Sequence, residues 1–161
     1  MDESAQIPAP TGAAPGPAPG ARRVRLPKPV LGAILEHARA AAPAECCGAL
    51  IGQGAGADER RVLRALALPN EDANPARYRI APALVRAAEA EAALRGLEVV
   101  GFYHSHPGAG PVPSATDLEW AWPWYTYVIV DVSRGLARAW CLREDRSGFG
   151  EEELVGGEGA T

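Results

Sequence analysis

The chain has 161 residues, enough for one domain with its own hydrophobic core but too few for an eight-stranded α/β barrel, which typically needs ~250 residues. Sixteen basic and twenty acidic residues give a net charge of −4, and the basic residues do not cluster as they do in proteins that bind nucleic acid. No apolar stretch approaches the ~20 residues that a membrane-spanning helix needs. We therefore expect a single-domain protein that binds neither nucleic acid nor a membrane.

Two features of the sequence indicate a cytoplasmic location. The three cysteines include the neighbours Cys46 and Cys47, whereas a secreted domain more often carries an even, spaced set that forms disulfides. Residues 1–21 also lack the basic start and the apolar stretch of a secretory signal peptide. The interpretation of reduced thiols in a cytoplasmic protein is therefore preferred.

The composition divides the chain into three parts. Residues 1–22 are rich in Pro, Ala and Gly, and burial of so few large apolar side chains cannot offset the entropy of ordering, which predicts a disordered tail. Residues 23–155 carry the regular apolar patterns of a folded domain. Residues 156–161 are predicted to form a flexible C-terminal tail.

The first half of the domain is predicted to contain one helix and two strands. Apolar residues at helical spacing predict an amphipathic helix over residues 30–42. Apolar runs bounded by glycines and turns then predict strands at 46–51 and 61–68. The polar segment 69–79 is predicted to be a loop that closes with a short strand at 78–80.

The second half is predicted to alternate helices and strands. A helix that begins with a proline is expected over residues 84–95, and the apolar run 97–103 is a predicted central strand. A short helix follows at 114–120. Residues 125–132 and Leu136–Leu142 are predicted to pair as a hairpin around a Ser-Arg-Gly turn.

The order of these elements predicts the fold class. Residues 149–155 are expected to add an edge strand after the hairpin. Helices and strands then alternate in a way that gives an α+β (α/β-like) domain, with a central mixed β-sheet flanked by helices. An extended edge strand of this kind is a surface that a partner's peptide tail can join by strand addition.

Two of the three histidines lie at the end of the predicted central strand, in the string His104-Ser105-His106-Pro107. Side chains alternate between the two faces of a strand, so a spacing of two points both imidazoles to one side. This arrangement is typical of two ligands that share one metal ion. A catalytic zinc takes a third protein ligand and leaves one position for water.

The nearest acid that could supply the third ligand is Asp117, in the string Ser114-x-x-Asp117. The same string is also a helix-opening capping box, with Ser114 as N-cap and an acid three residues later. The two interpretations are compatible, because a capped helix can hold Asp117 in place while its carboxylate binds a metal.

These motifs together resemble the JAMM (MPN+) family of zinc metallopeptidases. The residues that carry the resemblance are His104, His106, Ser114, Asp117 and, in the segment PAECCGALIG, Glu45. The resemblance implies the family's cytidine deaminase-like fold, with Zn²⁺ bound by His104, His106 and Asp117. It also implies that Glu45 moves the proton of the attacking water and that Ser114 hydrogen-bonds the oxyanion.

Two residues near this constellation keep a second interpretation. Glu45 taken alone fits a surface acid between a helix and a strand, and only the H-x-H context favours the catalytic role. Cys47 should share the side of Glu45, where its thiol either contacts the zinc or fills the core, and core filling is preferred.

The resemblance also implies a class of substrate. The family mostly cuts after the C-terminal Gly-Gly of ubiquitin-like proteins, and small stand-alone bacterial members resemble enzymes that release cysteine from a sulfur-carrier protein. We expect such a carrier to bind over the loop 70–78 and the strand edge beside His104. The sequence leaves the oligomeric state open.

Two other classes of function compete with this interpretation. Many MPN relatives are non-catalytic scaffolds that have lost the ligands, but all five positions are present here. Barrel amidohydrolases also carry an H-x-H strand, but they need a longer chain and further histidines, and His37 is the only other histidine.

Overall fold

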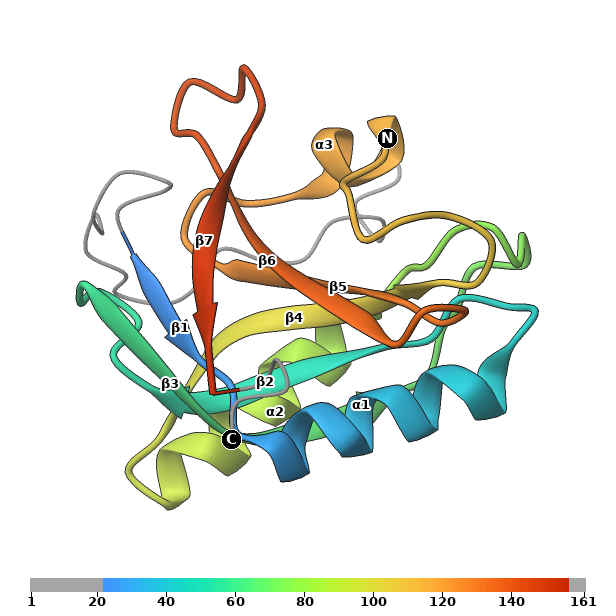
Figure 1. The fold of residues 1–161 in the computed structure, drawn as a ribbon. Helices are drawn as coiled ribbons and strands as arrows, with labels where there is room; N and C mark the ends of the chain where they lie inside the picture. Colours follow the sequence, from blue (N-terminus) through green and yellow to red (C-terminus); the bar gives the residue numbers. More distant parts are fainter. Residues whose placement is uncertain (1–21, 157–161) are drawn as a thin grey trace.

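The computed structural model of the chain describes residues 22–156, which form seven strands and three helices (Figure 1). In chain order these elements are β1 (Arg23–Arg25), α1 (Lys28–Ala41), β2 (Cys47–Gln53), β3 (Glu59–Leu68), α2 (Pro82–Leu94), β4 (Glu98–His106), α3 (Ala115–Trp120), β5 (Thr126–Asp131), β6 (Leu136–Leu142) and β7 (Phe149–Val155). The predicted α+β class, with a mixed sheet and flanking helices, is confirmed.

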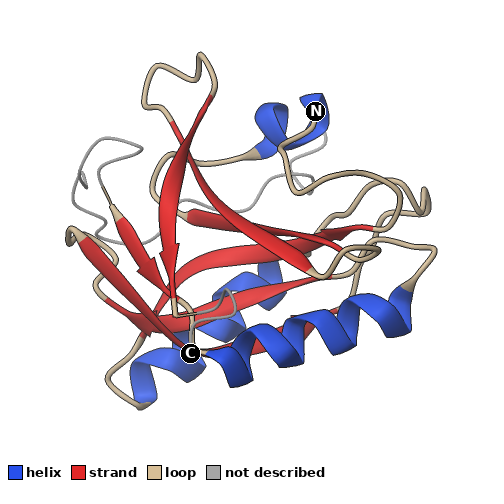
Figure 2. Ribbon diagram, in the orientation of Figure 1, coloured by secondary structure: helices blue, strands red, loops and turns tan. Residues whose placement is uncertain are grey.

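The seven strands form one sheet that closes on itself. Their order is β1-β3-β2-β4-β5-β6-β7, and β1 pairs in parallel with both β3 and β7 (Figure 2). The prediction that residues 149–155 form an edge strand is therefore wrong, because β7 pairs with β6 along its first half and with β1 along its second. The edge that was expected to accept a peptide tail is already paired.

The two long helices cover opposite faces of β2 and β4. Buried side chains alternate along these strands, so that Leu50 and Tyr103 join the core under α1, whereas Ala49 and Phe102 join the core under α2. Both helices begin beside a proline, which tolerates the first helical turn because its missing N–H would be unpaired there. The H-x-H strand is thus held between two packed layers.

Strand β4 is central, and it has a neighbour on each side along its histidine end. His104 is opposite Cys47 of the antiparallel β2 and opposite Ile129 of the parallel β5. Gly101 permits the close approach of β5, since a Cβ there would collide with the carbonyl of Thr126. The expected open strand edge beside His104 is therefore absent from the described sheet.

The segment that connects β3 to α2 contains no strand, so the predicted short strand at 78–80 is wrong. A side chain replaces the expected ladder: the N–H of Arg79 donates to Oδ1 of Asn70 at 3.0 Å. The alternating Tyr-Arg-Ile pattern is compatible with extended backbone, but a strand also needs a neighbouring strand to bond with.

A buried network of charges lies where the sheet closes. Arg22 forms an ion pair with Glu152 at 3.2 Å, and the hydroxyl of Thr126 donates to the same carboxylate at 2.7 Å. Arg60 donates to Thr126 at 2.8 Å and to the carbonyl of Val100 at 2.9 Å. These bonds join β3, β4, β5 and β7, so the network links the strands where the sheet closes.

The ends of the domain agree only partly with the predicted boundaries. Arg22 belongs to the predicted tail, yet it is buried and paired with Glu152. The other residues of the predicted tails, apart from Gly156, lie outside the described part of the chain, so the boundaries stay predictions. Within residues 22–156, no helix is both long enough and apolar enough to cross a membrane.

The buried network predicts a large loss of stability when its single carboxylate is neutralised. Glu152→Gln leaves Arg22 and Arg60 in the interior without a counter-charge, and we expect the free energy of unfolding to fall by about 3–5 kcal/mol. Urea unfolding measures the change. Glu91→Gln, which removes an exposed pair with Arg64, is the control and should have a far smaller effect. Equal effects of the two variants would contradict the structural role of the network.

Candidate active site

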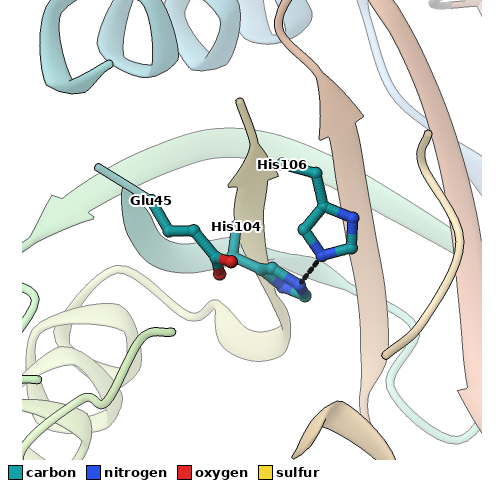
Figure 3. A group of neighbouring side chains, drawn as sticks. All are labelled: Glu45, His104 and His106. Carbon is teal, nitrogen blue, oxygen red and sulfur yellow. Dashed lines mark hydrogen bonds between the residues drawn. The ribbon is translucent and has the colours of Figure 1, made fainter. Parts of the chain in front are cut away.

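The two predicted metal ligands on β4 point to the same side. Figure 3 shows the rings of His104 and His106 converging, with their Nε2 atoms 3.2 Å apart. Ser105 points to the opposite face, where its Oγ accepts the N–H of Cys46 at 2.8 Å. The alternation expected from the H-x-H spacing is therefore present, and it leaves both Nε2 atoms beside each other in a largely buried site.

Asp117 reaches the same point from α3. Its Oδ2 lies 3.2 Å from Nε2 of His104 and 3.6 Å from Nε2 of His106. The capping box is also present, because Oγ of Ser114 accepts the N–H of Asp117 at 3.1 Å and Oδ2 of Asp117 accepts the N–H of Ser114 at 2.8 Å. The capping box is thus confirmed, and the same carboxylate lies beside both histidines, as a metal ligand would need to.

These three atoms have the spacing of a metal triad. Tetrahedral zinc with bonds of about 2.0–2.1 Å holds its ligand atoms about 3.3 Å apart. The separations among Nε2 of His104, Nε2 of His106 and Oδ2 of Asp117 are 3.2, 3.2 and 3.6 Å. Two imidazoles and one carboxylate are also a donor set that zinc accepts in catalytic sites. The residues therefore fit a zinc ion bound by three protein ligands.

Glu45 lies beside this triad, in the segment just before β2. Its carboxylate and the nitrogens of the two histidines all lie within 4.8 Å of one another (Figure 3). Burial raises the pKa of Glu45 to about 7, although His106 partly opposes this increase. A carboxylate with such a pKa can both take up and release a proton near neutral pH.

The charges of the site favour an ionised Asp117. Burial disfavours its charge, but His104, His106 and the N–H of Ser114 outweigh burial and hold the pKa of Asp117 well below its usual range. Burial also lowers the pKa of His106, but hydrogen bonds to Asp117 and to the carbonyl of Gly110 raise it by more. The surroundings of Asp117 thus stabilise its ionised carboxylate, which is the form that can bind a metal ion.

Cys47 is close to Glu45 in sequence but its thiol is directed elsewhere. Its Sγ lies 3.7 Å from each of the carbonyl oxygens of Leu68 and Pro69. Burial raises the pKa of Cys47 to about 12, so the thiol stays protonated. This environment favours the core-filling interpretation, because the thiol is directed toward two backbone carbonyls.

Tyr78 and Gly110 support the histidines and were not predicted from the sequence. The ring of Tyr78 stacks on His104 with centroids 4.4 Å apart, and the carbonyl of Gly110 accepts from Nδ1 of His106 at 2.8 Å. Nδ1 of His104 has no hydrogen-bond partner among the described residues, so the stack and the contacts of Nε2 together hold the ring. Both supporting residues lie in loops, where spacing alone carries no signal of the contact.

The sequence matches a known family over most of the described domain. Residues 27–143 fit the family described as prokaryotic homologues of the JAB domain. The chain belongs to the JAB (JAMM/MPN) family. The resemblance that the motifs indicated is thereby confirmed.

Two curated relatives are similar over most of their length. A protein of Haloferax volcanii named desampylase is 42% identical over 135 residues, which cover 77% of this chain and 92% of the relative. A desampylase of Pyrococcus furiosus is 34% identical over 119 residues, which cover 74% of this chain and 81% of the relative.

Solved structures show the same fold. A protein from Desulfitobacterium hafniense matches with a TM-score of 0.74 and 32% identity, over 82% of this chain and 91% of its own. A protein from Salinibacter ruber matches with a TM-score of 0.63 and 38% identity, over 87% of this chain and 94% of its own. A JAB1/MPN domain protein from Archaeoglobus fulgidus, with a TM-score of 0.52 and 22% identity over 83% of this chain and 98% of its own, agrees in fold.

The stack of Tyr78 on His104 predicts an effect on metal affinity. Tyr78→Leu removes the ring that orients His104, and we expect zinc affinity to fall by about tenfold, the lower end of the effect of groups that support metal ligands. Tyr78→Phe keeps the ring and should keep the affinity. Competition with a chelator of known affinity measures both, and equal zinc affinities for the two variants would contradict the orienting role.

Proposed function

We propose that this protein is a zinc-dependent peptidase or isopeptidase that hydrolyses the bond after the C-terminal Gly-Gly of a ubiquitin-like or sulfur-carrier protein. The observation that carries the proposal is the convergence of His104, His106 and Asp117, with Glu45 beside them. These are the residues on which the family resemblance rests. His104, His106 and Asp117 would hold the zinc ion.

The chemistry needs an activated water and a stabilised oxyanion. Zinc, when bound, would lower the pKa of a water to about 7 and polarise the carbonyl to be attacked. Glu45 would take up the proton of the attacking water and pass it to the leaving amine, a role that its raised pKa suits.

Ser114 would donate a hydrogen bond to the oxyanion that develops on the substrate. Its Oγ already accepts the N–H of Asp117, which fixes the oxygen at the start of α3. The hydroxyl hydrogen is not used by that bond and remains available for donation, since a hydroxyl both donates and accepts. A donor held in advance at the point where negative charge develops stabilises the transition state.

The class of substrate is supported by the relatives and by the loop beside the site. Both curated relatives carry the name desampylase, which denotes hydrolysis of conjugates of ubiquitin-like modifiers. The loop 70–78 contacts both Glu45 and His104 in the structure, so a tail that enters the site passes this loop. This loop is the proposed binding surface for the carrier protein. The strand edge beside His104 is excluded, because it is already paired with β2 and β5.

A non-catalytic scaffold is the alternative function. A scaffold needs the fold, but it does not need the spacing of the ligand atoms, the half-buried carboxylate of Glu45 beside them or the hydroxyl at the N-cap of α3. All three features are present together here, which favours the enzyme.

The proposal predicts cleavage of defined adducts. The zinc-loaded protein should release cysteine, or a lysine peptide, from a ubiquitin-like carrier joined through its C-terminal Gly-Gly. Glu45→Gln should lower kcat by about 10²–10⁴-fold because it removes the proton acceptor, with zinc content unchanged. Mass spectrometry of the carrier measures the product.

Two controls make the assay selective. Glu36→Gln changes an exposed acid of α1 and should leave cleavage unchanged, and a carrier that lacks the Gly-Gly should resist cleavage. If the wild-type protein leaves both adducts intact, or if Glu45→Gln cleaves them as fast as the wild type, the proposed function is wrong.

A further inference from the structure

Asn70, the first polar residue after β3, has a fully used carboxamide. Its Nδ2 donates to the carbonyl of Glu45 at 3.0 Å and to the carbonyl of Arg77 at 2.9 Å. Its Oδ1 accepts the N–H of Asp72 at 2.9 Å and the N–H of Arg79 at 3.0 Å. An amide offers two donors and two acceptor sites, and all four are occupied by backbone groups.

The backbone of Glu45 depends on this loop. Glu45 precedes the first ladder pair of β2, in which Cys47 is opposite His104. Its N–H donates to the carbonyl of Pro75 at 2.9 Å, and its carbonyl accepts from Asn70. Both backbone groups of Glu45 are thus bonded to the loop between β3 and α2 rather than to a strand.

The position of the Glu45 carboxylate follows from that of its backbone. Glu45 lies just before β2, outside the strand, and its side chain reaches the histidine pair from there. A rotation of this segment would therefore move the carboxylate relative to His104 and His106. A displacement of about 1 Å of a reacting group can cost about 10²-fold in rate. The bond from Asn70 to Glu45 restricts such a rotation.

We propose that Asn70 is a positioning residue that acts through Glu45: its carboxamide fixes the Glu45 peptide to the loop and thereby sets the carboxylate beside the two histidines. The consequence for catalysis rests on the proposed function. The positional claim does not, because it concerns hydrogen bonds of the free protein.

Asn74 supplies a matched control in the same loop. Its Oδ1 accepts the N–H of Ala76 at 2.9 Å, which is a local turn of the same chemical kind as that between Asn70 and Asp72. This side-chain bond of Asn74 stays within the loop and does not involve Glu45. Substitution of Asn74 therefore disturbs the loop without removing the link to the base.

The test compares Asn70→Ala, Asn70→Asp and Asn74→Ala. The aspartate keeps the two acceptor bonds to Asp72 and Arg79 but loses both donor bonds, to Glu45 and to Arg77, so it removes the link to the base while part of the loop's support remains. Hydrogen exchange of the Glu45 and Cys46 amides reports on the position of the segment without any substrate. Steady-state kinetics on a cleavable carrier adduct then separate kcat from KM.

We expect faster exchange at Glu45 and Cys46 in both Asn70 variants, with a kcat about 10–100-fold lower, KM little changed and zinc still bound. Asn74→Ala should match the wild type in exchange at Glu45 and Cys46. Unchanged exchange at Glu45 in both Asn70 variants, or an Asn70→Asp variant as active as the wild type, would overturn the proposal.

The exchange measurement also separates this inference from the proposed function. If the wild-type protein cleaves no adduct but both Asn70 variants expose the Glu45 amide, the positioning role is supported and the proposed function fails. If the adducts are cleaved and Asn74→Ala speeds exchange at Glu45 as much as Asn70→Ala does, the proposed function is supported and the specific role of Asn70 is wrong.

Discussion

The antiparallel pairing of β2 with β4 is the constraint on which the site depends. Its register sets Cys47 opposite His104, so the residues just before β2 arrive beside the histidine pair. Two hydrogen bonds between Cys46 and Ser105, of 2.8 and 3.2 Å, extend this pairing by one residue. Glu45 is the residue just before Cys46, so it too lies beside the histidine pair. A slip of one residue would turn the H-x-H side chains toward α1 and separate Glu45 from them.

The second half of the site depends on a helix too short to be stable alone. α3 has six residues, and helices of this length need external support. The capping box of Ser114 and Asp117 satisfies its first turn, and Arg146 donates to the carbonyls of Glu119 and Ala121 at its other end. Support at both ends holds α3 in place. The carboxylate of Asp117, which caps the helix, is therefore held beside the histidines.

Much of this arrangement was predictable because the signals are local. Strand alternation indicated that His104 and His106 share a face, and the Ser-x-x-Asp spacing indicated a capped helix. The family resemblance supplied Glu45, whose own surroundings in the sequence fit a surface acid better than a catalytic residue. The structure places all five residues in one region, while their chemical roles remain part of the proposal.

The contacts that were missed join distant parts of the chain. β1 has three residues, too few for a pattern, yet its pairing with β3 and β7 closes the sheet and removes the predicted edge. Asn70 and Tyr78 lie in a segment whose composition indicates only a loop. Their importance comes from bonds to Glu45 and a stack on His104, which tertiary structure alone creates.

The central claim is that the two histidines and Asp117 hold one zinc ion. The most direct test is the metal content of the protein purified under conditions that preserve bound metals, beside His106→Ala prepared in the same way. The account predicts close to one zinc per chain in the wild type and a large loss in the variant. A wild-type protein without zinc that also fails to take it up, or a variant that retains it fully, would contradict the account and favour the non-catalytic scaffold.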